Sequence, residues 1–73
     1  MPSTAIRKIV YDTGARKMWV TFTSGRRYIY EDVAPEVVHA FQQAESRGAF
    51  FNHEIRDHYS YREVTLHPRR KAG

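Results

Sequence analysis

Three pairs of adjacent basic residues lie in the first 30 positions of the chain, which hold only one acidic residue, Asp12. Guanidinium and ammonium groups bind the phosphates of nucleic acids, and an aromatic ring can stack on a base or a ribose. The pattern predicts a nucleic-acid surface. The residues expected to form it are Arg7, Lys8, Arg16, Lys17, Trp19, Thr21, Arg26 and Arg27.

Charge is unevenly distributed along the chain. Residues 1–30 hold six basic residues and one acidic residue, a net charge of +5. Residues 31–57 hold two basic and six acidic residues, and residues 58–73 hold four basic residues and one acidic residue, giving −4 and +3. This segregation favours one face, assisted by the C-terminal tail, that attracts polyanions. The alternative is ordinary solvated surface charge.

The length of 73 residues suits one small domain with a small core. There is no cysteine, so neither a disulfide nor a thiolate metal site can contribute. No apolar run approaches the roughly 18 residues that a transmembrane helix requires. The N-terminus also lacks the apolar core of a signal peptide. We therefore expect a cytoplasmic protein that makes no membrane contact.

The titratable side chains form no recognisable catalytic or metal-binding pattern. No two carboxylates make an obvious pair, and no Gly-rich phosphate loop is present. His53 and His58 are five residues apart on an expected helix, so they do not share a face as two metal ligands would. The sequence therefore predicts a non-catalytic binding module with no cofactor and no metal.

The stretch from Met18 to Tyr30 is predicted to form a β-hairpin, because β-branched and aromatic residues alternate on both sides of a Ser-Gly turn. A two-residue loop would separate the apolar residues of the first strand from the tyrosines of the second. A three-residue loop, a type I turn with Gly25 as the left-handed bulge residue, pairs Val20 with Tyr28 and Met18 with Tyr30. We expect this second register because it collects five large side chains on one face.

The opposite face of the hairpin carries Trp19 across from Ile29, beside Arg27. This pair could simply stiffen the sheet, or it could belong to a contact surface. Instead of binding nucleic acid, the chain could be a protein–protein adaptor or a self-associating domain that uses the surface around Trp19 and Ile29. Tyr28 and Tyr30 could also stack on bases, as in single-strand-binding platforms, but the register favours their burial in the core.

Residues 5–12 are predicted to form the first strand, and a turn follows over residues 12–15 in which Gly14 supplies a positive φ. Because this connection is short, the strand should pair antiparallel with the next one. That geometry brings Arg7-Lys8 beside Arg26-Arg27, so that four basic groups cluster at one corner of the sheet.

Two short helices are predicted after the hairpin. The first begins at Pro35, where the missing N–H costs nothing, and ends near Glu45 with its apolar stripe on the sheet. Ser46 is the expected N-cap of the second helix, over residues 49–58. Phe50 and Phe51 are adjacent and cannot share one helical face, so one should contact the sheet and the other the first helix.

The sequence thus predicts an α+β fold over residues 3–62, a three-stranded antiparallel β-meander followed by two short helices packed on one face (β-β-β-α-α). Residues 59–66 are ambiguous between a short extended strand along the sheet edge and a segment that drapes over it. Residues 63–73 are expected to form a basic, flexible C-terminal tail.

Three stretches carry a family resemblance: Tyr28-Ile29-Tyr30, the segment 32–35 ending in Pro35, and the segment 46–52 followed by Ile55. With them the chain resembles the KTSC domain, found as a small bacterial protein and at the C-terminus of some lysyl-tRNA synthetases. Where such domains commonly have Val-Pro before the helix, this chain has Val-Ala-Pro. The synthetase attachment implies RNA, including tRNA, as the expected partner, an inference by association.

Overall fold

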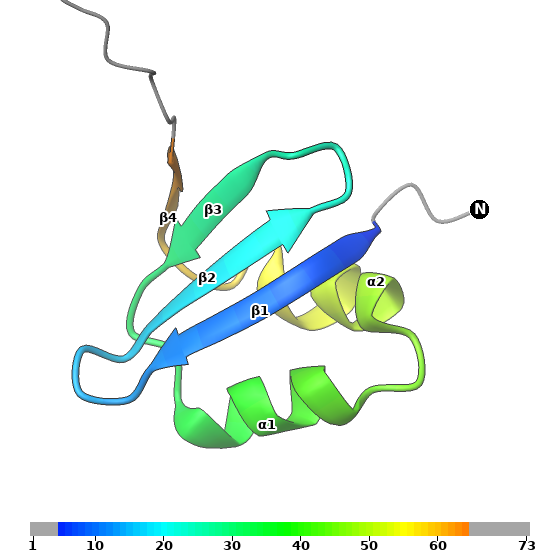
Figure 1. The fold of residues 1–73 in the computed structure, drawn as a ribbon. Coiled ribbons are helices and arrows are strands. Elements are labelled where there is room, and N and C mark those ends of the chain that lie inside the picture. Colours follow the sequence, from blue (N-terminus) through cyan, green and yellow to red (C-terminus); the bar gives the residue numbers. More distant parts are fainter. Residues whose placement is uncertain (1–4, 65–73) are drawn as a thin grey trace, which may run out of the picture.

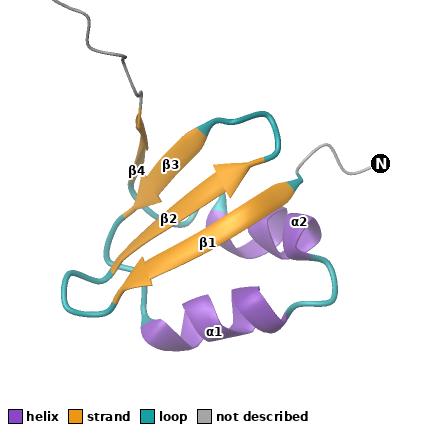
Figure 2. Cartoon of the chain, viewed as in Figure 1, coloured by secondary structure: helices purple, strands orange, loops and turns teal. Residues whose placement is uncertain are grey.

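The computed structural model describes residues 5–64 and shows one antiparallel sheet with helices packed on one of its faces (Figure 1). The strands are β1 (Ile6–Asp12), β2 (Lys17–Phe22), β3 (Arg27–Tyr30) and β4 (Tyr61–Val64), in that order across the sheet. The helical elements between β3 and β4 are α1 (Pro35–Gln43), α2 (Arg47–Phe50) and the π-helix η1 (Phe51–Ile55), as Figure 2 shows. No helix within residues 5–64 is long and apolar enough to cross a membrane.

The sheet has four strands, so the prediction of three is wrong. β4 pairs antiparallel with β3, with Tyr61 opposite Tyr30 and Val64 opposite Arg27. Its three exposed residues give little apolar alternation, which is why the pattern left the segment ambiguous. Residues 63 and 64 therefore lie in the sheet and not in a tail, and residues 65–73 lie outside the described part of the chain.

The register predicted for the hairpin is confirmed. Val20 lies opposite Tyr28 and Met18 lies opposite Tyr30. The Gly25 N–H donates to the Phe22 carbonyl at 2.8 Å, and Gly25 has a φ of 97°, the left-handed conformation of a bulge residue. The three-residue loop therefore sets which side chains enter the core.

The turn between β1 and β2 differs from the prediction in one respect. The positive φ belongs to Arg16, at 57°, and not to Gly14. The Asp12 carboxylate accepts a hydrogen bond from the Ala15 N–H at 3.2 Å, the local role expected of an Asx residue in a turn. Arg16 adopts the left-handed conformation because its backbone and side chain are both held by the segment that follows β3.

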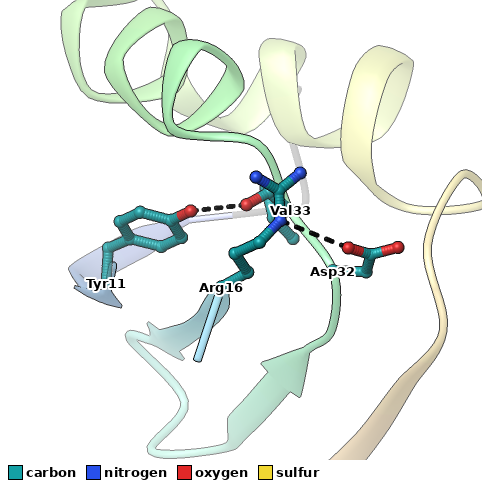
Figure 3. Close-up of polar contacts among 4 residues, drawn as sticks. All are labelled: Tyr11, Arg16, Asp32 and Val33. Carbon is teal, nitrogen blue, oxygen red and sulfur yellow. Dashed lines mark hydrogen bonds and ion pairs between the residues drawn. The ribbon is translucent and has the colours of Figure 1, made fainter. Parts of the chain in front are cut away.

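The contact between Arg16 and Asp32 joins the β1–β2 turn to the segment between β3 and α1, and Figure 3 draws it. The Arg16 guanidinium lies 3.3 Å from the Asp32 carboxylate, and the Val33 N–H donates to the Arg16 carbonyl at 3.0 Å. The Tyr11 hydroxyl donates to the Val33 carbonyl at 2.6 Å. These bonds fix the chain at the point where it leaves the sheet and enters α1.

The core lies between the sheet and the helices, and its fully buried side chains are Met18, Val20, Val33, Phe41 and Ile55. α1 begins at Pro35 as predicted but ends at Gln43, because Ala44 is already extended. The Ser46 hydroxyl caps the next helix by accepting from the Ala49 N–H at 3.2 Å, as predicted. That helix begins at Arg47 and becomes a π-helix at Phe51, which the sequence did not indicate.

The two adjacent phenylalanines divide between the helix and the sheet, as predicted. The Phe51 ring packs edge-on against Phe22 and Tyr30 of the sheet, with ring centroids 5.2 and 5.7 Å apart. The Phe50 ring stacks on Phe41 of α1 at 5.5 Å. This division holds the short second helix against both layers.

Candidate nucleic-acid interface

The helices cover one face of the sheet and leave the other without a helical layer (Figure 1). Two cross-strand rows run over this second face, which we call the outer face. One row joins Val10, Trp19, Ile29 and Arg62 from the four strands, and the other joins Lys8, Thr21, Arg27 and Val64. Because side chains alternate along each strand, all eight project from the same side.

An open concavity of ≈ 430 Å³ lies on the outer face. Lys8, Val10, Asp12, Trp19, Thr21 and Arg27 line it. Trp19 is half-buried and Val10 is 45% exposed, whereas Ile29 retains only 7% exposure. The concavity is therefore lined by an indole and a valine together with two cations and one carboxylate.

Four of the eight predicted residues are brought together in this concavity: Lys8, Trp19, Thr21 and Arg27. Lys17 lies on the same face at the far end of β2, opposite Asp12. Arg7 is the extra residue of a bulge, since Ile6 pairs with Phe22 while Lys8 already pairs with Thr21. The strand register alone did not reveal that bulge.

Arg16 and Arg26 do not join the outer-face group. Arg16 serves the loop contact with Asp32 described above. Arg26 lies in the loop before β3, opposite Phe22 on the helix side of the sheet, with its guanidinium 3.8 Å from the Glu63 carboxylate. The Tyr28 hydroxyl and then the Glu63 charge raise the pKa of Arg26. The four cations expected at one corner are thus divided between two faces.

The cations of the outer face differ in how they are engaged. The Arg62 guanidinium lies 3.7 Å from the Glu31 carboxylate. Lys8, Lys17 and Arg27 make no ion pair within residues 5–64. These three charges are therefore free of protein counter-ions in that range, which is the state that phosphate binding requires.

The histidines offer no metal site in the part of the chain that the structure describes. The His58 ring nitrogen lies 3.1 Å from the His53 carbonyl oxygen, a local helix-end contact. Residues 5–64 contain no group of three or more side chains with suitable donors for a metal ion.

The family model of the KTSC domain matches residues 2–59. The chain belongs to the KTSC domain family. It is 40% identical over 62 residues to an uncharacterised protein of Stutzerimonas stutzeri, which covers 84% of this chain and 87% of that protein. A protein of Tsukamurella paurometabola is 40% identical over 50 residues, covering 68% of this chain and 75% of that protein.

A solved KTSC fold also matches. The crystal structure of a KTSC domain protein from Yersinia pestis superposes with a TM-score of 0.78 and 29% identity, covering 89% of this chain and 90% of that chain. The sheet and the helix pair described above are therefore the architecture of a KTSC domain.

Within this KTSC domain, two of the three stretches that carried the resemblance meet on the helix side of the sheet. Tyr28, Tyr30, Phe51 and Asn52 line the second concavity, of ≈ 370 Å³. Arg56 and Tyr61 line it too, and sequence reasoning did not single out either of them for function. Arg56 follows a π-helix, and Tyr61 begins a strand that the sequence left as one of two alternatives, so the spacing of neither residue pointed to this place.

Proposed function

We propose that this KTSC domain is a non-catalytic binding module whose outer face binds single-stranded RNA with little sequence preference. The observation that carries the proposal is one concavity in which Lys8 on β1 and Arg27 on β3 lie on either side of Thr21, two residues along β2 from Trp19. Single-strand binders combine an aromatic ring, on which a base stacks, with cations that track the phosphates. This concavity contains the aromatic ring of Trp19 and the two cations Lys8 and Arg27.

Electrostatics supports an anionic partner. The outer face carries Lys8, Lys17, Arg27 and Arg62, and its single acid in the concavity is Asp12. Asp12 is already engaged with the Ala15 N–H. The net positive charge of this face therefore attracts phosphates and repels basic partners.

The burial of Ile29 favours RNA over a protein partner on this face. A protein interface needs a contiguous apolar centre. Ile29 is 7% exposed and can contribute little contact area, so the available apolar surface is Val10 together with the open parts of Trp19 and Val64. That area suits the stacking of one or two bases better than an apolar anchor of a partner protein.

The test is a binding titration with a labelled single-stranded RNA of about 12 nucleotides. For three or four phosphate contacts we expect log Kd to rise with log salt with a slope of about 2 to 3. Trp19 is the one tryptophan in the sequence, so its fluorescence should be quenched as a base stacks on it. A slope near zero, or unchanged tryptophan fluorescence at saturation, contradicts the proposal.

Charge reversals locate the site. Lys8→Glu and Arg27→Glu should each weaken binding about tenfold, because each removes a phosphate contact and adds repulsion. Arg47→Glu is the matched control, since Arg47 is exposed on α2 on the helix side of the sheet. If the outer-face variants weaken binding no more than Arg47→Glu does, the RNA does not bind this face.

A further inference from the structure

The concavity on the helix side of the sheet joins the β2–β3 loop, β3, β4 and η1, and has a volume of ≈ 370 Å³. It is a separate surface from the outer face, because the sheet lies between the two. Its aromatic lining consists of Phe22, Tyr28, Tyr30, Phe51 and Tyr61. Its charged and amide lining consists of Arg26, Asn52 and Arg56.

Three tyrosines form one continuous aromatic surface in this concavity. The Tyr61 ring stacks on Tyr30 with ring centroids 5.4 Å apart, and it lies 5.7 Å from the Tyr28 ring. Tyr30 is almost fully buried, whereas Tyr61 is 56% exposed. Within residues 5–64, Tyr61 and Val10 are the large hydrophobic residues that are exposed, and Tyr61 is the more exposed of the two. Tyr61 therefore offers a planar ring to any molecule that enters.

Two guanidinium groups border the aromatic surface from different elements. Arg26 comes from the β2–β3 loop, and its contact with Glu63 is long and well exposed, so solvent screens it strongly. Arg56 follows η1, is exposed, and makes no ion pair within residues 5–64. Its charge lies near enough to the Tyr30 hydroxyl to act on it.

Asn52 and Arg56 reach the concavity from one side of the π-helix η1 and its end. The Arg56 N–H donates to the Phe51 carbonyl at 2.8 Å, the wider turn of a π-helix. Phe51 and Ile55 enter the core, and the residues that follow each of them, Asn52 and Arg56, line the concavity together. Such widened turns are frequent at functional sites.

We propose that this concavity binds a nucleoside monophosphate, with the base against Tyr61 and Tyr28 and the phosphate between Arg26 and Arg56. Two guanidiniums that line one concavity match the double charge of a phosphate monoester. Tyrosine rings stack on bases without regard to sequence, and the amide of Asn52 can recognise polar edges. The volume lies at the low end of the range for ligand pockets, about 300–1,000 Å³, and so suits one nucleotide unit.

The same chemistry could be presented by a free nucleotide or by the phosphorylated end of a strand. This site is independent of the proposed outer-face function, because none of its lining residues belongs to the outer-face concavity. Lys8→Glu should therefore leave nucleotide binding unchanged, and tryptophan fluorescence should not respond to a mononucleotide. Failure of one site can thus be told from failure of the other.

The experiment is an amide chemical-shift titration of the full chain with adenosine 5′-monophosphate, adenosine and inorganic phosphate. We expect saturable shifts in η1 and β4 with the monophosphate, and at least about tenfold weaker binding of adenosine and of phosphate, since each lacks half of the contacts. Phosphate binding as tightly as the monophosphate, or no saturation up to about 10 mM, overturns the proposal.

Variants assign the contacts. Arg56→Gln should weaken the monophosphate about tenfold, because it removes one charge-assisted contact from an exposed position. Arg47→Gln, equally exposed, is the matched control, and equal affinities of the two variants would overturn the assignment. Competition by a 5′-phosphorylated trinucleotide but not by its 5′-hydroxyl form identifies a strand end as the source, and competition by neither identifies the free nucleotide.

Discussion

The ring of Tyr61 stacks on that of Tyr30 across two neighbouring strands, with centroids 5.4 Å and ring planes 27° apart. Tyr61 is more than half exposed, while Tyr30 retains 3% of its surface. The Tyr61 ring thus helps to cover the Tyr30 ring. The short β4 strand is held to the sheet by this aromatic contact as well as by its backbone pairing with β3. The burial of Tyr30 affects the ionisation of its hydroxyl.

Alkaline pH should destabilise the fold through Tyr30. Burial, followed by the neighbouring Tyr61 and Tyr28, raises the pKa of Tyr30 above the ordinary value. Above about pH 10 the unfolded chain releases this proton while the folded chain keeps it. The free energy of unfolding should therefore fall by up to about 1.4 kcal/mol per pH unit from this group, and be unaffected near neutrality.

Urea unfolding between about pH 8 and 11 measures this effect. Tyr30→Phe should have a shallower decline of stability above pH 10 than the parent chain, since the buried titrating group is gone. Parallel declines in the two proteins would show that Tyr30 does not contribute.

The hydrogen bond from the Tyr11 hydroxyl to the Val33 carbonyl, at 2.6 Å, should contribute to stability. Tyr11→Phe keeps the ring and removes the donor, and we expect a loss of about 0.5–1.5 kcal/mol in the free energy of unfolding. Tyr61→Phe is the control, because the 56% exposure of Tyr61 gives its hydroxyl ready access to water. Equal losses in both variants would mean that the Val33 contact adds nothing.

The two turn glycines should respond in opposite ways to alanine. Gly25 has a φ of 97°, and a Cβ there would meet no atom within 4 Å, so the cost of Gly25→Ala is that of the backbone alone, about 1–2 kcal/mol. Gly14 lacks a positive φ, and its nearest neighbour, an Asp12 carboxylate oxygen at 3.6 Å, would be in ordinary contact. Gly14→Ala should therefore be neutral or slightly stabilising, by up to about 1 kcal/mol.

Thermal unfolding of both variants checks this pair. A loss for Gly14→Ala equal to that of Gly25→Ala would contradict the assignment of the left-handed residue in the first turn to Arg16.

The sequence predicted those features that a local pattern determines. Strand alternation and the position of Gly25 were enough to derive the hairpin register, and Ser46 was enough to derive the helix cap. β4 stayed one of two alternatives because its pairing depends on Tyr30, 31 residues before Tyr61, and its exposed residues leave little periodicity. Long-range pairing of this kind has no local signature.

The candidate site was predicted in part for a similar reason. Lys8, Thr21 and Arg27 share a row, which the hairpin register implies once β1 is aligned. The separation of Arg26 from Arg27 follows from the alternation of extended chain, since two adjacent side chains project to opposite faces. The role of Arg16 depends on Asp32, and no local pattern connects those two residues.

The adjacent residues Phe50 and Phe51 should differ in their contribution to stability. Phe51 is 5% exposed and its ring contacts Phe22, Tyr30 and Phe41, so Phe51→Ala leaves a cavity in the core and should cost about 3–5 kcal/mol. Phe50 is half-buried and its ring stacks on Phe41 alone, so the same substitution leaves a gap that solvent can fill, and we expect a smaller loss.

Chemical unfolding of the Phe50→Ala and Phe51→Ala variants measures the difference. Phe51→Leu, which retains most of the volume, should recover part of the loss and keep the comparison usable if Phe51→Ala does not fold. A larger loss for Phe50→Ala than for Phe51→Leu and Phe51→Ala would mean that the second helix is held mainly by α1 and not by the sheet.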